Sequence, residues 1–121
     1  MGVTRTEDGN IELVVITDDA GADFNQTITF TTPVEIVRLK MEKPAAGTLV
    51  VNSVTNYSSG PSTIIGAASL GPADTSYYSN DSNLIHTVNL ESLTVVATSC
   101  GAGVKVSISA QNLLSEAGRD F

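Results

Sequence analysis

The clearest pattern in the sequence is an alternation of apolar and polar residues with a period of two near the end of the chain. Four apolar side chains share one face: Val104, Val106, Ile108 and Ala110. This alternation predicts a β-strand with one buried face. A β-branched run at residues 93–99 predicts a second strand, and the glycines of Cys100-Gly101-Ala102-Gly103 predict a tight reversal between the two. The two strands are therefore expected to form an antiparallel hairpin.

The same reasoning predicts strands in most of the remaining chain. They cover residues 11–17, 24–32, 34–41, 48–54, 62–70 and 84–88, although the small residues of 62–70 also fit a short helix. Pro33 is expected to end one strand before the next begins, and residues 71–83 are expected to form a surface loop. No helical periodicity, linker or repeat interrupts the pattern. The sequence therefore predicts an all-β fold over residues 1–121, a single antiparallel β-sandwich or jelly-roll-like domain of about seven to eight strands.

Composition and charge exclude several classes of function. Thirteen acidic residues against six basic ones give a net charge of −7, which argues against nucleic-acid and anionic-membrane partners because both require a basic surface. No apolar run approaches the roughly 20 residues of a membrane span, and residues 1–8 lack the apolar core of a signal peptide. A single cysteine excludes an internal disulfide. We therefore expect a soluble protein made in the cytosol.

The candidate catalytic residues do not form a recognisable motif. His86 is the only histidine and has no nucleophile motif near it, so a hydrolase built around it is a remote hypothesis. Cys100 would need His86 as its base, and a small residue at the end of a strand is the better interpretation. The sequence thus predicts a protein that is not an enzyme and that uses no cofactor.

Two loops carry side chains suited to binding. Asp18, Asp19 and Asp23 offer oxygen ligands, but their spacing differs from a calcium-binding loop, so a solvated acidic loop is favoured. The rings of Tyr57, Tyr77 and Tyr78 are of the kind that stacks on sugar rings, although carbohydrate-binding modules usually use Trp, which this chain lacks.

Basic residues are missing from half of the chain. Residues 44–104 contain no lysine or arginine, and only Asp74, Asp81 and Glu91 carry charge. A monomer normally has many surface charges, whereas an extended protein contact tolerates hydroxyl groups better than charges because they cost less to desolvate. This composition favours a protein that assembles with others.

The order of elements in residues 30–112 carries a resemblance. A strand at residues 34–41 leads through a Pro-Ala-Ala-Gly turn into a strand at residues 48–54. A Tyr-Tyr-Ser-Asn-Asp segment and a closing pair of strands with a glycine-rich turn follow. This order resembles the small β-sandwich virion accessory proteins of tailed bacteriophages, of the capsid decoration or cement type.

The resemblance implies a non-enzymatic virion protein that binds the outer surface of the phage head and stabilises it. Its partners would be the major capsid protein and further copies of itself, with a trimer favoured, and its location would be the virion. It also implies an extended N-terminal arm (residues 1–10) and a C-terminal tail (residues 113–121). The residues expected to contact partners are Val3, Arg5, Asp18, Asp19, Asp23, Tyr77 and Tyr78. The alternatives are a tail, adaptor or head-fibre component of the virion, and a carbohydrate-binding or adhesin module.

Overall fold

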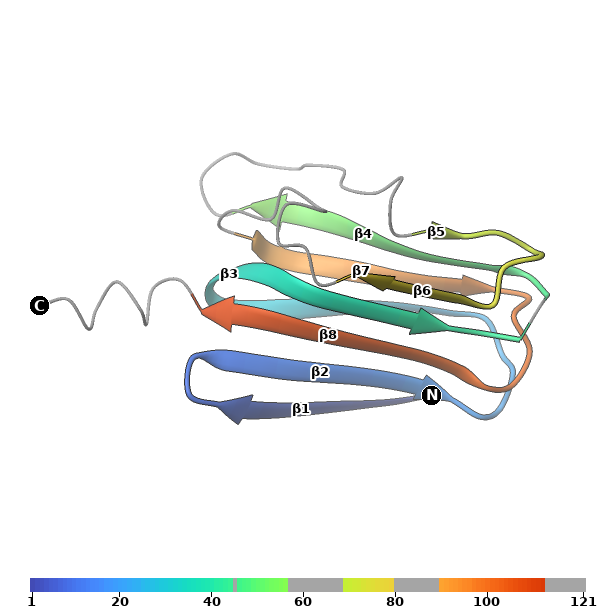
Figure 1. Cartoon of the computed structure of the whole chain (residues 1–121), viewed down its shortest axis with the longest axis horizontal. Coiled ribbons are helices and arrows are strands. Elements are labelled where there is room, and N and C mark those ends of the chain that lie inside the picture. The colour runs from blue at the N-terminus through green and yellow to red at the C-terminus, as the bar shows by residue number, and fades with distance from the viewer. Residues whose placement is uncertain (45, 57–68, 80–89, 113–121) are drawn as a thin grey trace, which may run out of the picture.

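The computed structural model describes residues 1–44, 46–56, 69–79 and 90–112 (Figure 1). It contains eight strands: β1 (Gly2–Asp8), β2 (Ile11–Asp18), β3 (Phe24–Glu42), β4 (Thr48–Asn56), β5 (Ser69–Leu70), β6 (Ser76–Ser79), β7 (Leu90–Thr98) and β8 (Val104–Asn112). All pairings are antiparallel, and the order in the sheet is β1-β2-β8-β3-β7-β4-β5, with β6 paired to β3. The predicted all-β fold is confirmed.

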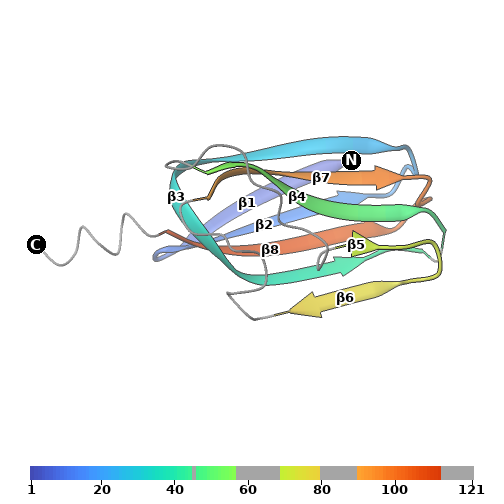
Figure 2. The same ribbon diagram turned by 90° about the horizontal axis from the view of Figure 1, so that it is seen from above.

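The long strand β3 folds this sheet over on itself. Residues 24–29 of β3 pair with β7, and residues 34–42 pair with β8, with residues 39–42 also paired to β6. The β3–β7 register shifts between Thr29 and Val34, where β3 bends from one layer to the other (Figure 2). We call the layer with β1, β2, β8, β6 and the second half of β3 the first layer. The second layer holds the first half of β3 with β7, β4 and β5.

One cluster of buried side chains fills the space between the layers, and it draws on both. Its larger members include Ile16, Ile28, Phe30, Ile36, Leu39, Met41, Leu49, Leu93 and Ile108. The predicted inward face of β8 is confirmed, since Val104, Val106, Ile108 and Ala110 are all buried. The core is almost wholly aliphatic because the chain contains only three phenylalanines and three tyrosines.

The expected hairpin of residues 93–110 is wrong. β7 and β8 do not pair with each other: β7 lies between β3 and β4, and β8 lies between β2 and β3. The glycine-rich segment between them, residues 99–103, instead connects the two layers, and we call it the arch. Its backbone has positive φ at Ser99, Gly101 and Gly103. A glycine-rich turn reverses the chain whether or not the two flanking strands pair with each other. Here β3 lies between β7 and β8, so each of these strands pairs with β3 instead.

Two further expectations about strand boundaries are wrong. Pro33 does not end a strand, because β3 runs through it. It lies at the bend where β3 leaves β7, a place where a missing N–H interrupts no regular ladder. The expected loop at residues 71–83 contains strand β6, which pairs with residues 39–42 of β3. Tyr77 of β6 packs against the core, which holds this short strand in place.

The segment expected to be an extended arm is an edge strand. β1 pairs with β2 along its whole length, from Gly2 opposite Thr17 to Asp8 opposite Ile11. The expected strand at residues 84–88 and the expected tail at residues 113–121 lie outside the described residues. The same holds for His86 and for residues 62–68 of the strand expected at 62–70.

Candidate partner-binding surfaces

The loops at one end of the strands are fastened to the arch. The backbone N–H of Ser99 donates to Asp23 Oδ1 at 2.7 Å, and that of Gly103 donates to the carbonyl of Asp18 at 2.8 Å. The buried thiol of Cys100 donates to the carbonyl of Thr48 at 3.0 Å. The β2–β3 loop and the start of β4 thus meet at one backbone segment, on the right in Figure 1. Cys100 is a buried packing residue at the end of a strand.

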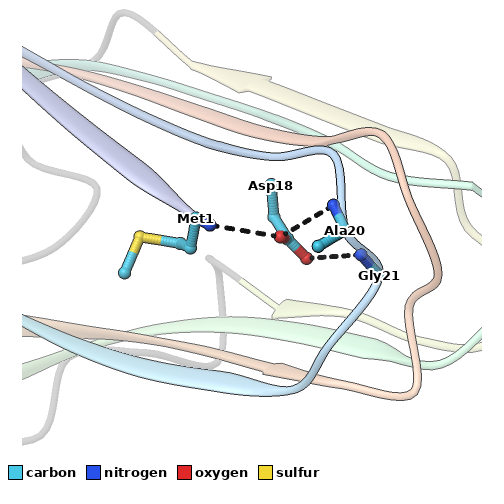
Figure 3. A network of polar contacts seen from close by, with 4 residues as sticks. All are labelled: Met1, Asp18, Ala20 and Gly21. Atoms are coloured by element: carbon cyan, nitrogen blue, oxygen red, sulfur yellow. Dashed lines mark hydrogen bonds and ion pairs between the residues drawn. The ribbon is translucent and has the colours of Figure 1, made fainter.

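The acidic loop does not gather its carboxylates. Asp18 is 2% exposed, and its carboxylate accepts hydrogen bonds from the N–H groups of Ala20 and Gly21, each at 3.2 Å (Figure 3). The amino group of Met1 lies 3.6 Å from Asp18 Oδ1. Asp23 binds the arch, and Asp19 is exposed. Among the described residues no group of three His, Cys, Asp or Glu side chains is arranged to hold a metal ion. Two of the three predicted contact aspartates therefore organise the loop itself.

Replacing Asp18 with alanine is expected to lower the free energy of unfolding by about 2 kcal/mol, because two backbone donors lose their acceptor. Asp18→Asn keeps one oxygen acceptor and should cost less. Urea unfolding followed by circular dichroism measures both. Asp19→Ala, which removes an exposed carboxylate from the same loop, should stay within about 0.5 kcal/mol of the parent. An equal effect of the two alanine substitutions would contradict this interpretation.

The two tyrosines of β6 point to opposite sides of the sheet. Tyr77 lies opposite the buried Met41 and is half-buried against the core. Tyr78 lies opposite Lys40 and is 57% exposed on the outer surface of the first layer. Two rings on opposite faces cannot stack on one sugar ring. Of the pair, Tyr78 is the residue available for contact with a partner.

A buried lysine fastens the turn before β6. Lys43 is 5% exposed, and its ammonium donates to three backbone carbonyls, those of Pro44, Ala46 and Asp74, at 3.3, 3.4 and 2.6 Å. Its own N–H donates to the carbonyl of Thr75 at 3.0 Å. Sequence reasoning missed this role, because nothing local indicates that the carbonyls of Asp74 and Thr75, some 30 residues away, lie beside Lys43.

Over most of the described length of β3, β7 and β4, the outer surface of the second layer carries no charged side chain; Glu91, the charged residue of β7, lies at the end where the register with β4 shifts. We call this surface the neutral face. Its outward-pointing side chains from β3, β7 and β4 are Asn25, Thr27, Thr48, Val50, Asn52, Thr94, Val96 and Thr98. The hydroxyls of Thr27 and Thr94 lie 3.2 Å apart. By contrast, the outer surface of the first layer carries Arg38, Lys40, Glu42 and Lys105. The basic-poor half of the sequence therefore contributes most of one continuous uncharged surface.

A second outward feature was missed by the sequence reasoning. Ile11, Leu13 and Val15 of β2 point away from the core, and Leu13 is 41% exposed. The inward residues of the same strand, Val14 and Ile16, are fully buried. Strands that carry apolar side chains on both faces are typically covered on both faces. The sequence indicates this feature, because residues 11–16 are apolar except for Glu12.

The two predicted contact residues of β1 lie on its core-side face. Val3 is opposite Ile16, and Arg5 is opposite Val14. The Arg5 guanidinium binds the carboxylate of Glu12 through Nε and Nη2 and lies over the ring of Phe30, 5.5 Å from its centroid. The hydrogen bond to Glu12 raises the pKa of Arg5, as do the charges of Glu12 and Glu7, while burial opposes them. Val3 remains 37% exposed because this face of β1 reaches the open side of the sandwich.

The predicted contact residues thus lie in three separate places. Val3 and Arg5 are on β1, the three aspartates are in or beside the β2–β3 loop, and Tyr78 is on the outer surface of the first layer. The structure does not bring them together into one site. In the described part of the chain, no helix has the length and apolar character needed to cross a membrane.

No protein-family model and no curated protein matches the sequence. Several solved structures resemble it distantly. The Cnp3 cupin domain of Schizosaccharomyces pombe is 12% identical with a TM-score of 0.39, over 98% of this chain and 63% of that one. The coat protein of Tobacco streak virus is 14% identical with a TM-score of 0.38, over 88% and 89% of the two chains. A mutant family 29 carbohydrate-binding module is 12% identical with a TM-score of 0.37, over 92% and 75%. These similarities are to β-sandwich and jelly-roll structures and indicate no specific family.

Proposed function

We propose that this chain is a non-enzymatic structural protein of a virus particle, a capsid decoration protein that binds the outer surface of a phage head. The observation that carries this proposal is the neutral face. The resemblance of residues 30–112 to virion accessory proteins supplies the context. The partner is then the major capsid protein, and the location is the virion.

The neutral face is suited to a broad protein contact for a physical reason. Burying an unpaired charge is costly, whereas threonine and asparagine side chains lose less on desolvation and can hydrogen-bond across an interface. Valines at its centre, Val50 and Val96, add apolar area. Interfaces are depleted of charged residues at their centre in the same way. The charged outer surface of the first layer would face solvent and keep the particle surface hydrophilic.

The first test is the copy number of this chain in purified particles from its source, relative to the major capsid protein. Decoration predicts about one copy per capsid subunit, because each symmetric capsid site is equivalent. A few copies per particle would contradict decoration and indicate a tail, adaptor or vertex component. Absence from the particles would contradict any virion role.

Charges placed on the neutral face should weaken particle binding whatever their sign. Thr27→Lys and Thr27→Glu are each expected to reduce affinity for particles about tenfold or more, since either charge would be desolvated at the contact. Binding is measured by co-sedimentation with particles that lack the endogenous protein. Ser107→Lys and Ser107→Glu, on the outer surface of the first layer, serve as matched controls and should bind like the parent. Equal losses at both positions would contradict the assignment of the neutral face.

A further inference from the structure

The first strand leaves one long edge of the sheet free. β1 pairs with β2 over seven consecutive residues without a register shift, and its other edge pairs with no strand of the described chain. All seven side chains of β1 are exposed. β1 also contains neither proline nor a bulge, two of the devices that commonly block edge pairing. Such an edge is open to a strand from another chain.

The turn that joins β1 to β2 determines which backbone groups point outward. Asp8 lies opposite Ile11 across a two-residue turn, and Gly9 has a φ of 65°, as expected for a type II′ hairpin. In such a turn the flanking pair shares a hydrogen bond, and hydrogen-bonded pairs then alternate along the ladder. The backbone groups of Val3, Arg5 and Glu7 are therefore directed away from β2. They form the free edge.

We propose that a second copy of this chain pairs with the free edge of β1 in antiparallel orientation, on a two-fold axis that passes between Thr6 and the partner's Thr6. Arg5 then lies opposite the partner's Glu7, and Glu7 lies opposite the partner's Arg5. The first layers of the two copies become one continuous sheet. This inference goes beyond capsid binding and does not depend on it.

Charge complementarity selects this register. A two-fold axis at Arg5 would place it opposite the partner's Arg5, and an axis at Glu7 would place two carboxylates opposite each other, which is destabilising. An axis at Thr4 would leave Arg5 opposite the partner's Val3. Registers shifted by one residue would pair core-side residues with outward ones. The axis at Thr6 is the register that matches opposite charges twice.

The side chain of Arg5 is already prepared for a second carboxylate. Glu12 holds its Nε and Nη2, and the ring of Phe30 lies beneath the guanidinium. A guanidinium has five N–H donors, so the Nη1 group remains for the partner's Glu7. Because Arg5 is held in place before association, less side-chain entropy is lost when the pair forms.

A cysteine cross-link tests the register directly. Across the proposed interface Thr6 is a non-hydrogen-bonded pair, whose Cα atoms lie about 4.5 Å apart, within the range that a disulfide spans. Thr6→Cys should therefore give a disulfide-linked dimer under mild oxidation. Thr4→Cys is the control, because on this axis its two copies lie about 14 Å apart. The buried native Cys100 is shielded from the reaction. Efficient cross-linking through Thr4→Cys, or none through Thr6→Cys, would overturn the register.

Sedimentation velocity over a concentration series tests association without cross-linking. The full chain should form dimers, and Glu7→Lys should weaken them about tenfold or more, because it places a cation opposite the partner's Arg5. Asp8→Lys makes the same change of charge one residue away, opposite the partner's Thr4, and should dimerise like the parent. A parent chain that stays monomeric or forms trimers would overturn the proposal, as would equal effects of the two lysine substitutions.

Discussion

Replacing Gly47 with alanine is expected to destabilise the protein by about 3–5 kcal/mol, enough to unfold a marginally stable domain. A Cβ atom on Gly47 would lie 2.3 Å from the carbonyl oxygen of Thr98 and 2.4 Å from both the carbonyl carbon and oxygen of Ser99. These are backbone atoms at the start of the arch, so no side chain can rotate away. Gly47 also has a φ of 76°, which disfavours any residue with a Cβ. Thermal and urea unfolding measure the loss.

The control for this prediction lies in the arch itself. Gly101 has nearly the same φ, 75°, and a Cβ atom there would meet nothing within 4 Å. Gly101→Ala should therefore cost only the backbone strain of about 1 kcal/mol. The difference between the two losses in the free energy of unfolding measures the cost of a Cβ atom where the β3–β4 turn approaches the arch. Similar losses from both would show that the close approach contributes little.

Replacing Lys43 with methionine is expected to lower the free energy of unfolding by about 3 kcal/mol. Methionine fills a similar volume, but it leaves the carbonyls of Pro44, Ala46 and Asp74 without their shared donor. Each of these carbonyls then loses a partly buried, charge-assisted hydrogen bond. Because Lys43 connects the end of β3 to the turn before β6, hydrogen exchange should accelerate most at β6.

Lys40→Met is the matched control. Lys40 lies on the same strand with its side chain 52% exposed, and its ammonium is 3.4 Å from the carboxylate of Glu42. An exposed ion pair of this kind contributes little, so the change should stay within about 0.5 kcal/mol. Equal effects at Lys40 and Lys43 would contradict the role assigned to the buried ammonium. Acceleration of exchange spread evenly over the sheet would contradict the local fastening of β6.

The β-strands and their buried faces could be predicted from the sequence because both are local properties. The alternation along residues 104–110 places every second side chain on one face, whatever the strand pairs with. Aspartates and a glycine likewise mark the turn at residues 18–23, and a proline and a glycine mark the turn at residues 43–47. For the same reason the basic-poor half of the chain could be recognised, although not the surface on which it would gather.

Strand partners could not be predicted in this way. Residues 93–110 read as a hairpin because a glycine-rich reversal joins two strands, yet β3 separates β7 from β8 in the sheet. Hydrogen bonds between strands are alike for any pairing, so the choice depends on how the inward faces fill one core. Pro33 and Tyr77 show the same dependence. Each was judged by its neighbours in sequence, but the proline lies at the bend of β3, and the tyrosine anchors β6 against the core.

The same distinction between local and long-range properties applies to the candidate contact residues. The sequence by itself determined that the chain is all-β, acidic, and poor in basic residues over half its length. Only the tertiary structure decided that Asp18 is buried, that Lys43 binds three carbonyls, and that β1 has an edge with which no other strand of the described residues pairs. Burial and edge position depend on segments far apart in the chain, and a side-chain pattern of period two contains no information about them.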